Sequence, residues 1–236
     1  MTLPKLETPM HSCVLPIAET KVEYRPFLVG EQKVLLMAQE SEDQNTQIKE
    51  MMRLIDVCCD DVDVKQLATT DLEYLFLQIR VKSVGETAKV NMICQECETE
   101  NELDVDLENV KVVGGEEKAN NTIDLTDTIS LDLQYPSYDM MKHLDVSAEE
   151  QSTEDMFILM AACITSIKDG DEIHTKDDFN KKELMSFLDS MSLSMFEEVQ
   201  TYFATAPTIE LPIKYKCTNC ESEQRENVVG IANFFN

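Results

Sequence analysis

Tryptophan is absent from this sequence, and all aromatic residues together make up only 6% of its 236 residues. No apolar stretch reaches the roughly 20 residues that a transmembrane helix requires, so no membrane span is predicted. Basic residues are scarce: 20 Lys and Arg stand against 46 Asp and Glu, which gives a net charge of −26. Such a surface repels nucleic-acid phosphates and anionic lipids. The composition therefore predicts no nucleic acid and no membrane among the partners, and it favours a basic protein.

Signatures of catalysis are also missing. The sequence contains no G-x-S-x-G, Walker A or G-x-G-x-x-G motif. Its three histidines, His11, His143 and His174, have no partner at the spacing of a metal site or a catalytic triad. The acidic segments 60–63 and 169–172 do not match a calcium-binding EF-hand loop. We therefore expect a protein that is not an enzyme and has no small-molecule substrate.

Cysteine is plentiful, with eight residues, and four of them form two Cys-x-x-Cys pairs. Cys94 and Cys97 form the first pair, Cys217 and Cys220 form the second, and both read C-x-x-C-E-x-E. A Cys-x-x-Cys turn aims two sulfurs at one ion, and four such sulfurs are the ligand set of a structural zinc. The sequence thus predicts one zinc that ties the middle of the chain to its end.

Two other interpretations of these pairs stay open. In the first, the thiols are two unrelated reduced pairs or a lost metal site, since Glu98 and Glu221 stand where many metal knuckles have glycine. Alternatively, Cys94 and Cys97 form a redox dithiol, although such motifs usually begin a helix, whereas these lie between β segments. The remaining cysteines have no ligand spacing and are interpreted as small buried apolar residues: Cys13, Cys58, Cys59 and Cys163. Residues 1–5 do not resemble a signal peptide, so we expect a reducing compartment for these thiols.

The pattern of apolar residues predicts an α+β fold with a mostly helical body. Period-two alternation on both sides of each Cys pair predicts two β-hairpins, brought together like a split zinc ribbon. Predicted helices cover residues 31–38, 44–57, 70–82, 137–144, 156–167, 180–188 and 193–202. Predicted extended segments cover 14–24, 87–107, 123–133 and 209–215. The predicted regions are an N-terminal extended and helical region, a first knuckle with strands, a helical region, and a second knuckle with the C-terminal tail: 1–85, 86–135, 136–206 and 207–236. The metal would close 86–236 into one compact unit.

The chain ends on an apolar segment with two aromatic residues, Phe234 and Phe235. These side chains either pack on the core of the chain itself or anchor a neighbouring subunit. They are therefore candidates for contact with a partner.

Several stretches of the sequence, in their order along the chain, resemble the baseplate hub proteins of T4-like contractile-tailed bacteriophages. They are 22–29 (VEYRPFLV), 71–80 (DLEYLFLQIR), 82–86 (KSVGE), 214–220 (KYKCTNC) and the Phe234-Phe235 end. The paired thiols also match that family's pattern. The resemblance implies a non-enzymatic hub subunit or hub-assembly factor whose partners are other baseplate hub and tail proteins.

The same resemblance implies a location in the host cytoplasm during assembly, or in the tail baseplate of the virion. The alternative function, which rests on the cysteine pairs, is a zinc-ribbon regulatory module of the host or phage transcription machinery. A salt-dependent DNA-binding assay would separate the two hypotheses.

Overall fold

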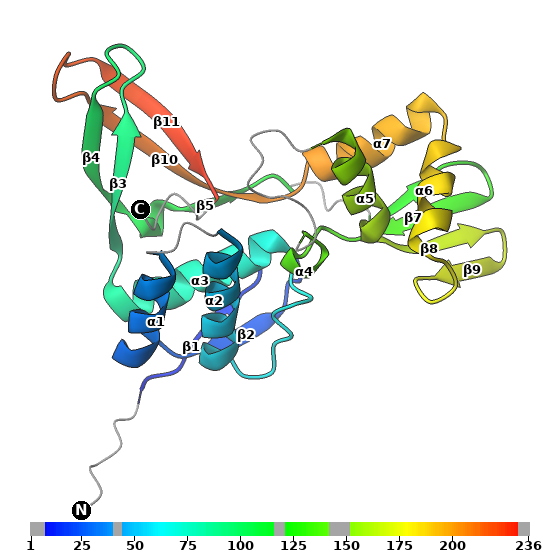
Figure 1. Cartoon of the computed structure of the whole chain (residues 1–236), viewed down its shortest axis with the longest axis horizontal. Coiled ribbons are helices and arrows are strands. Elements are labelled where there is room, and N and C mark those ends of the chain that lie inside the picture. The colour runs from blue at the N-terminus through cyan, green and yellow to red at the C-terminus, as the bar shows by residue number, and fades with distance from the viewer. Residues whose placement is uncertain (1–7, 40–43, 116–120, 142–151, 231–236) are drawn as a thin grey trace, which may run out of the picture. The chain divides into compact units, whose positions relative to one another are not determined.

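The computed structural model describes residues 8–39, 44–115, 121–141 and 152–230 (Figure 1). The chain divides into two compact units. Unit 1 comprises Met1–Val64, Thr70–Val113 and Thr208–Asn236, and unit 2 comprises Lys65–Thr69 and Gly114–Pro207. Unit 1 is thus assembled from stretches far apart in the sequence, and both Cys pairs belong to it.

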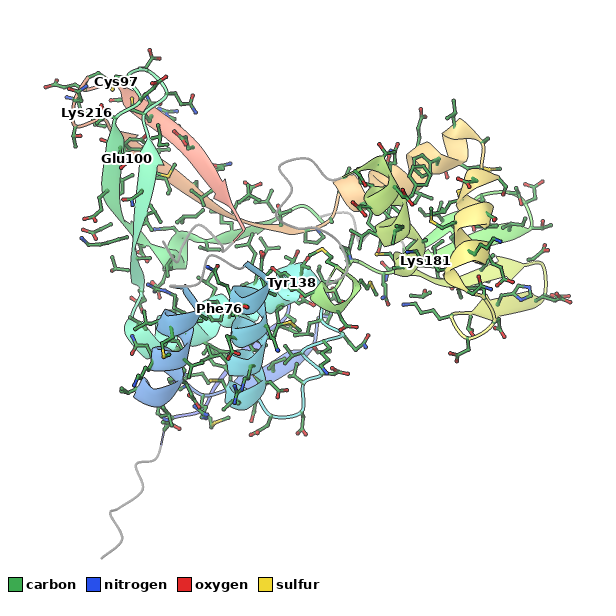
Figure 2. All side chains as sticks on the ribbon, viewed as in Figure 1. Phe76, Cys97, Glu100, Tyr138, Lys181 and Lys216 are labelled. Carbon is green, nitrogen blue, oxygen red and sulfur yellow. The ribbon has the colours of Figure 1, made fainter. Side chains whose placement is uncertain are left out.

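Unit 1 begins with two short antiparallel strands, β1 (His11–Val14) and β2 (Lys21–Tyr24), followed by three helices. These helices are α1 (Val29–Gln39), α2 (Gln44–Cys58) and α3 (Thr69–Val84). The apolar residues of α3 that recur at i, i+3, i+4 and i+7 are all buried: Leu72, Leu75, Phe76 and Ile79. Figure 2 labels Phe76 on this helix. Gly85 follows α3 at a φ of 118°, a conformation that glycine adopts without strain and that ends the helix.

The rest of unit 1 is two β-hairpins in two separate sheets. The first hairpin pairs β3 (Thr87–Ile93) with β4 (Glu100–Asp106) as a two-stranded sheet. A short 3₁₀ turn, η1 (Leu107–Asn109), leads into β5 (Lys111–Val113). The second hairpin, β10 (Thr208–Lys216) and β11 (Glu223–Val229), forms a three-stranded sheet with β5 in the order β11-β10-β5.

Unit 2 packs helices on a four-stranded antiparallel sheet. The strands, in the order β6-β7-β8-β9, are β6 (Thr122–Asp124), β7 (Ile129–Leu133), β8 (Ile164–Asp169) and β9 (Glu172–Thr175). The helices are α4 (Tyr138–Met141), α5 (Thr153–Cys163), α6 (Lys181–Asp189) and α7 (Leu193–Ala204), and Figure 2 labels Tyr138 and Lys181. A single core buries residues of β7, β8 and the helices, including Leu131, Leu133, Ile164, Leu188 and Val199.

A polar network occupies the strand positions of this sheet that alternate with the core residues. The Asp132 carboxylate accepts hydrogen bonds from the hydroxyls of Thr122 and Ser166, and Lys168 forms an ion pair with it at 2.9 Å. Burial opposes ionisation of Asp132, but these donors outweigh it and lower its pKa to about 2. The network therefore ties β6, β7 and β8 together through one ionised side chain.

The predicted fold class needs correction, because the body is mixed rather than mostly helical. About 39% of the structure is helix and 31% is strand, arranged in four sheets. Part of the error lies in residues 156–167, which were predicted as one helix. Helix α5 ends at Cys163, and β8 begins at Ile164. Ile164, Thr165 and Ile167 are β-branched and favour a strand, which pairs with β7 on one side and the unpredicted β9 on the other.

The description as a split zinc ribbon is also wrong. The Cys pairs lie near each other, but β3-β4 and β10-β11 belong to different sheets and do not form one ribbon. The predicted alternation around each pair is nevertheless correct, since both pairs lie in the turns of antiparallel hairpins. Phe234, Phe235 and His143 lie outside the described residues. Among the described helices, none has both the length and the apolar character needed to cross a membrane.

Candidate metal centre

The turns of the two hairpins bring four cysteine sulfurs together. Cys94 follows β3 and Cys217 follows β10, while Cys97 and Cys220 lie three residues further along each turn. Cys94 and Cys217 are buried, Cys97 is half-buried and Cys220 is exposed. Figure 2 shows Cys97 at the tip of the hairpin pair, with Glu100 and Lys216 labelled nearby. The predicted ligand set therefore converges at one end of unit 1, with its open side at Cys220.

The spacing of these sulfurs fits a tetrahedral ion. The Sγ atoms of Cys94 and Cys220 are 3.7 Å apart, those of Cys97 and Cys217 are 3.6 Å apart, and all four lie within 4.8 Å of one another. Four sulfurs at about 2.3 Å from a central zinc would be about 3.8 Å apart. All four cysteines are free thiols. The cluster could thus hold a metal ion with little rearrangement.

Both turns use the same backbone hydrogen bonds, in agreement with their similar sequences. In the first, Cys94 N donates to Thr99 O at 2.9 Å and Glu98 N donates to Cys94 O at 2.9 Å. In the second, Cys217 N donates to Ser222 O at 2.9 Å and Glu221 N donates to Cys217 O at 3.1 Å. The C-x-x-C-E-x-E repeat is therefore a repeat of three-dimensional structure as well as of sequence.

The glutamate after each pair occupies a position that favours glycine. Glu98 has a φ of 57° and Glu221 a φ of 58°, both in the left-handed region. A residue with a side chain pays about 1 to 2 kcal/mol for this conformation. The turns keep the glycine-type geometry despite the missing glycines. The departure from the common sequence pattern therefore changes local strain and charge, but not the shape of the turn.

Hydroxyl groups at equivalent positions of the two turns contact the sulfurs. Thr99 Oγ1 lies 3.3 Å from Cys97 Sγ, and Ser222 Oγ lies 3.1 Å from Cys220 Sγ. Gln224 Nε2 donates to Ser222 Oγ at 2.8 Å and so orients that hydroxyl. Groups of this kind stabilise thiolates and hold metal ligands in place.

Asn101 joins the two hairpins beside the cluster. Its side chain is 2% exposed, and its Oδ1 accepts from both the N–H and the hydroxyl of Thr218 at 2.9 Å. Its Nδ2 donates to Thr99 O at 2.8 Å and lies 3.8 Å from Cys217 Sγ. One buried amide thus satisfies groups in both turns and points a donor at a sulfur.

Sequence reasoning found the four thiols but missed these supporting residues. Their signal lies in an extension of the repeat on both sides of its final glutamates, Glu100 and Glu223. One position before those residues, both turns carry a hydroxyl, Thr99 or Ser222, and one position after them both carry an amide, Asn101 or Gln224. The longer pattern C-x-x-C-E-[ST]-E-[NQ] would have identified them.

The surroundings of the cluster favour thiolates at two positions. Hydrogen bonding by Thr99 lowers the pKa of Cys97 to about 6. Backbone N–H groups of Cys220 and Asn219 lower the pKa of Cys217. Because the thiolate is the form that binds metal, the turns prepare these sulfurs for a cation.

The other cysteines behave differently. Burial raises the pKa of Cys58 to about 11 and that of Cys59 and Cys163 to about 12, so all three remain thiols. These three are buried, as expected, whereas Cys13 is half-buried, and its pKa is also raised to about 11.

The remaining histidine candidates within the described residues are not part of this cluster. His11 lies in β1 beside the Tyr24 ring, and the exposed His174 lies in β9 near Glu172. Within the described part of the chain, Cys94, Cys97, Cys217 and Cys220 form the group of potential metal ligands that the fold assembles.

Comparison with protein families gives one match that covers nearly the whole chain. Residues 8–236 match the family model described as T4 bacteriophage base plate protein. Comparison with curated proteins and with solved structures gives no match. The match includes both hairpins and all four clustered cysteines.

Proposed function

Because the chain belongs to the T4 bacteriophage base plate protein family, we propose that it is a non-enzymatic structural or assembly protein of the base plate's central hub. The family match over residues 8–236 is the observation that carries this proposal. The resemblance of several sequence stretches to hub proteins supports a position in the hub in particular. Its partners would be other hub and tail proteins, met in the host cytoplasm where the particle is built.

The chemistry of the chain is consistent with a role based on contacts. A net charge of −26 disfavours phosphate backbones and lipid surfaces and favours basic protein surfaces. The clustered thiols belong to hairpin turns that hold two sheets together, which is a structural position. The function that this architecture supports best is binding to other proteins rather than catalysis.

We further propose that Cys94, Cys97, Cys217 and Cys220 bind one structural zinc ion. The thiols fit a tetrahedral thiolate site, and hydroxyl and amide donors surround the sulfurs. Bound zinc would neutralise thiolate charge and cross-link β3-β4 to β10-β11 across 119 intervening residues. In small zinc domains such a site contributes on the order of 10 kcal/mol to folding. The ion would fix the relative position of the two hairpin turns.

Mass spectrometry of purified tails and of hub assembly intermediates from infected cells tests the structural role. Detection in either sample at a fixed ratio to hub proteins is the expected result. Presence in mature tails identifies a permanent subunit, and presence only in intermediates identifies an assembly factor. Absence from both samples refutes the proposal. Electron-microscopic localisation at the periphery of the base plate would refute the hub assignment alone.

Elemental analysis of protein purified without chelators tests the metal proposal. We expect about one zinc per chain, and Co²⁺ substitution should give the visible absorption of a tetrahedral thiolate site. Folded protein that contains no metal and does not take up Co²⁺ would contradict the metal assignment and leave the base plate role untouched.

A further inference from the structure

An open strand edge faces a groove between the two hairpins of unit 1. The groove has a volume of about 310 Å³ and is lined by Glu102, Leu103, Asp104, Val105 and Asp106 of β4, by Asn109, and by Leu211, Pro212, Ile213, Lys214 and Tyr215 of β10. Successive side chains of a strand point to opposite faces. Five consecutive residues of one strand can therefore line the same groove only along the edge of that strand.

The ladder of the first hairpin shows which main-chain groups point into that edge. Cys94 N donates to Thr99 O at one end of the hairpin, and Leu107 N donates to Glu86 O at the other. Between these ends, residue pairs that are hydrogen-bonded alternate with pairs that are not. The odd-numbered residues of β4 therefore bond to β3. The main-chain N–H and C=O groups of the even-numbered residues point away from β3: Glu100, Glu102, Asp104 and Asp106. Within the described residues, β4 pairs with β3 alone.

The opposite wall of the groove is less suited to strand pairing. Cys217 N donates to Ser222 O and Gly230 N donates to Ile209 O, so the even-numbered residues of β10 point away from β11. Strand β5 covers this edge only at residues 208–210. The next outward position is Pro212, which has no N–H to donate. Within the groove, β10 therefore offers one complete outward position, Lys214, whereas β4 offers three. An added strand would form its main-chain hydrogen bonds with β4.

The side chains around the β4 edge define the chemistry of the occupant. Glu100, Glu102, Asp104 and Asp106 are exposed at alternate positions, and Lys89 of β3 forms an ion pair with Glu102. Between them, Leu103 is half-buried and Val105 is buried. A matching strand would therefore alternate basic and apolar residues. A second copy of β4 is disfavoured, because its carboxylates would lie opposite these.

We propose that the open edge of β4 binds an extended basic segment of another base plate protein, which adds to the β3-β4 sheet as a third strand. This partner surface rests on the proposed structural function. Main-chain hydrogen bonds would give affinity, as in other cases of strand addition, and the carboxylate row would select lysine or arginine. The lining residues Glu102 to Asp106 are five residues of strand, which span about 17 Å at the usual rise per residue.

A peptide of about seven residues that alternates lysine with valine is a suitable probe, since it spans the groove. Titrated at low salt into the full-length protein, it should bind and protect the amide hydrogens of Glu102, Asp104 and Asp106 from exchange. The amides of Leu103 and Val105 already bond to β3 and should change little. Absence of binding, or protection at the inward amides alone, would overturn the proposal.

Two matched controls separate strand addition from general attraction of charge. The same peptide with N-methyl groups on alternate residues keeps its charge but loses its donors, and it should not bind. Asp104→Lys should weaken binding of the unmodified peptide at least about tenfold, because it places like charges together. Asp124→Lys makes the same change on β6, an edge strand of the other unit, and should have little effect.

Equal binding of the methylated peptide, equal effects of Asp104→Lys and Asp124→Lys, or self-association through β4 would each refute this mode of docking. None of these results would affect the detection of the chain in tails. Failure of the docking proposal is therefore distinguishable from failure of the proposed function.

Discussion

Replacement of Asn101 by alanine tests whether the two hairpins depend on each other. The substitution removes an amide that accepts two hydrogen bonds from Thr218 and donates one to Thr99 O at 2.8 Å. The alanine side chain cannot replace these contacts, and the turns leave little room for water at a side chain that is 2% exposed. Each net hydrogen bond contributes about 1 kcal/mol, and an unsatisfied buried group costs about 1 to 3 kcal/mol. We expect Asn101→Ala to lower the free energy of unfolding by about 2 to 4 kcal/mol.

The same substitution should weaken metal binding, because Nδ2 of Asn101 lies 3.8 Å from Cys217 Sγ. Loss of a group that orients a metal ligand typically lowers affinity about 10- to 100-fold. Asn101→Asp separates the two effects. It keeps the oxygen that accepts from Thr218 but places negative charge beside a thiolate, so zinc affinity should fall more than stability.

Urea unfolding and competition with a zinc chelator measure these two quantities. Asn91→Ala is the matched control, since Asn91 is an exposed residue of β3 in the same hairpin. Its effect should stay within about 0.5 kcal/mol. The reasoning would be refuted if Asn101→Ala matched Asn91→Ala in stability and left zinc affinity unchanged.

Three further changes probe the cluster and the second unit. Cys220→Ser should release zinc and destabilise unit 1, whereas Cys13→Ser should retain the metal; retention by both in elemental analysis would contradict the four-thiol site. Glu221→Gly should raise the free energy of unfolding in urea by about 1 kcal/mol, because glycine relieves the strain of the left-handed conformation. Glu221→Ala keeps that strain, so an equal gain from alanine would refute the explanation. The pKa of Asp132 is about 2 in the folded protein, below its usual value of about 4. The contribution of ionised Asp132 to stability is therefore full above about pH 4 and is lost as the pH falls toward 2. When the free energy of unfolding is measured from pH 5 to pH 2, Asp132→Asn should reduce its loss at the acid end.

Much of the site could be predicted from local sequence. Two Cys-x-x-Cys pairs between alternating apolar residues predict two hairpins with thiols in their turns, because turn geometry depends on nearby residues. Helix α3 could equally be predicted from local sequence, since its apolar residues recur at the spacing of helical turns. The left-handed conformation of Glu98 and Glu221 could not be predicted in this way, because glutamate rarely adopts a positive φ.

Sequence alone determined the charge, the two Cys-x-x-Cys pairs and the local hairpins, since each depends on composition or on residues close together in the chain. Only the tertiary structure decided that β8 begins at Ile164, because β7 provides the partner that turns an apolar run into a strand. Tertiary structure also decided that Asn101 bridges to Thr218 and that the edge of β4 stays open. Those features depend on contacts between segments more than 100 residues apart, which no local pattern encodes.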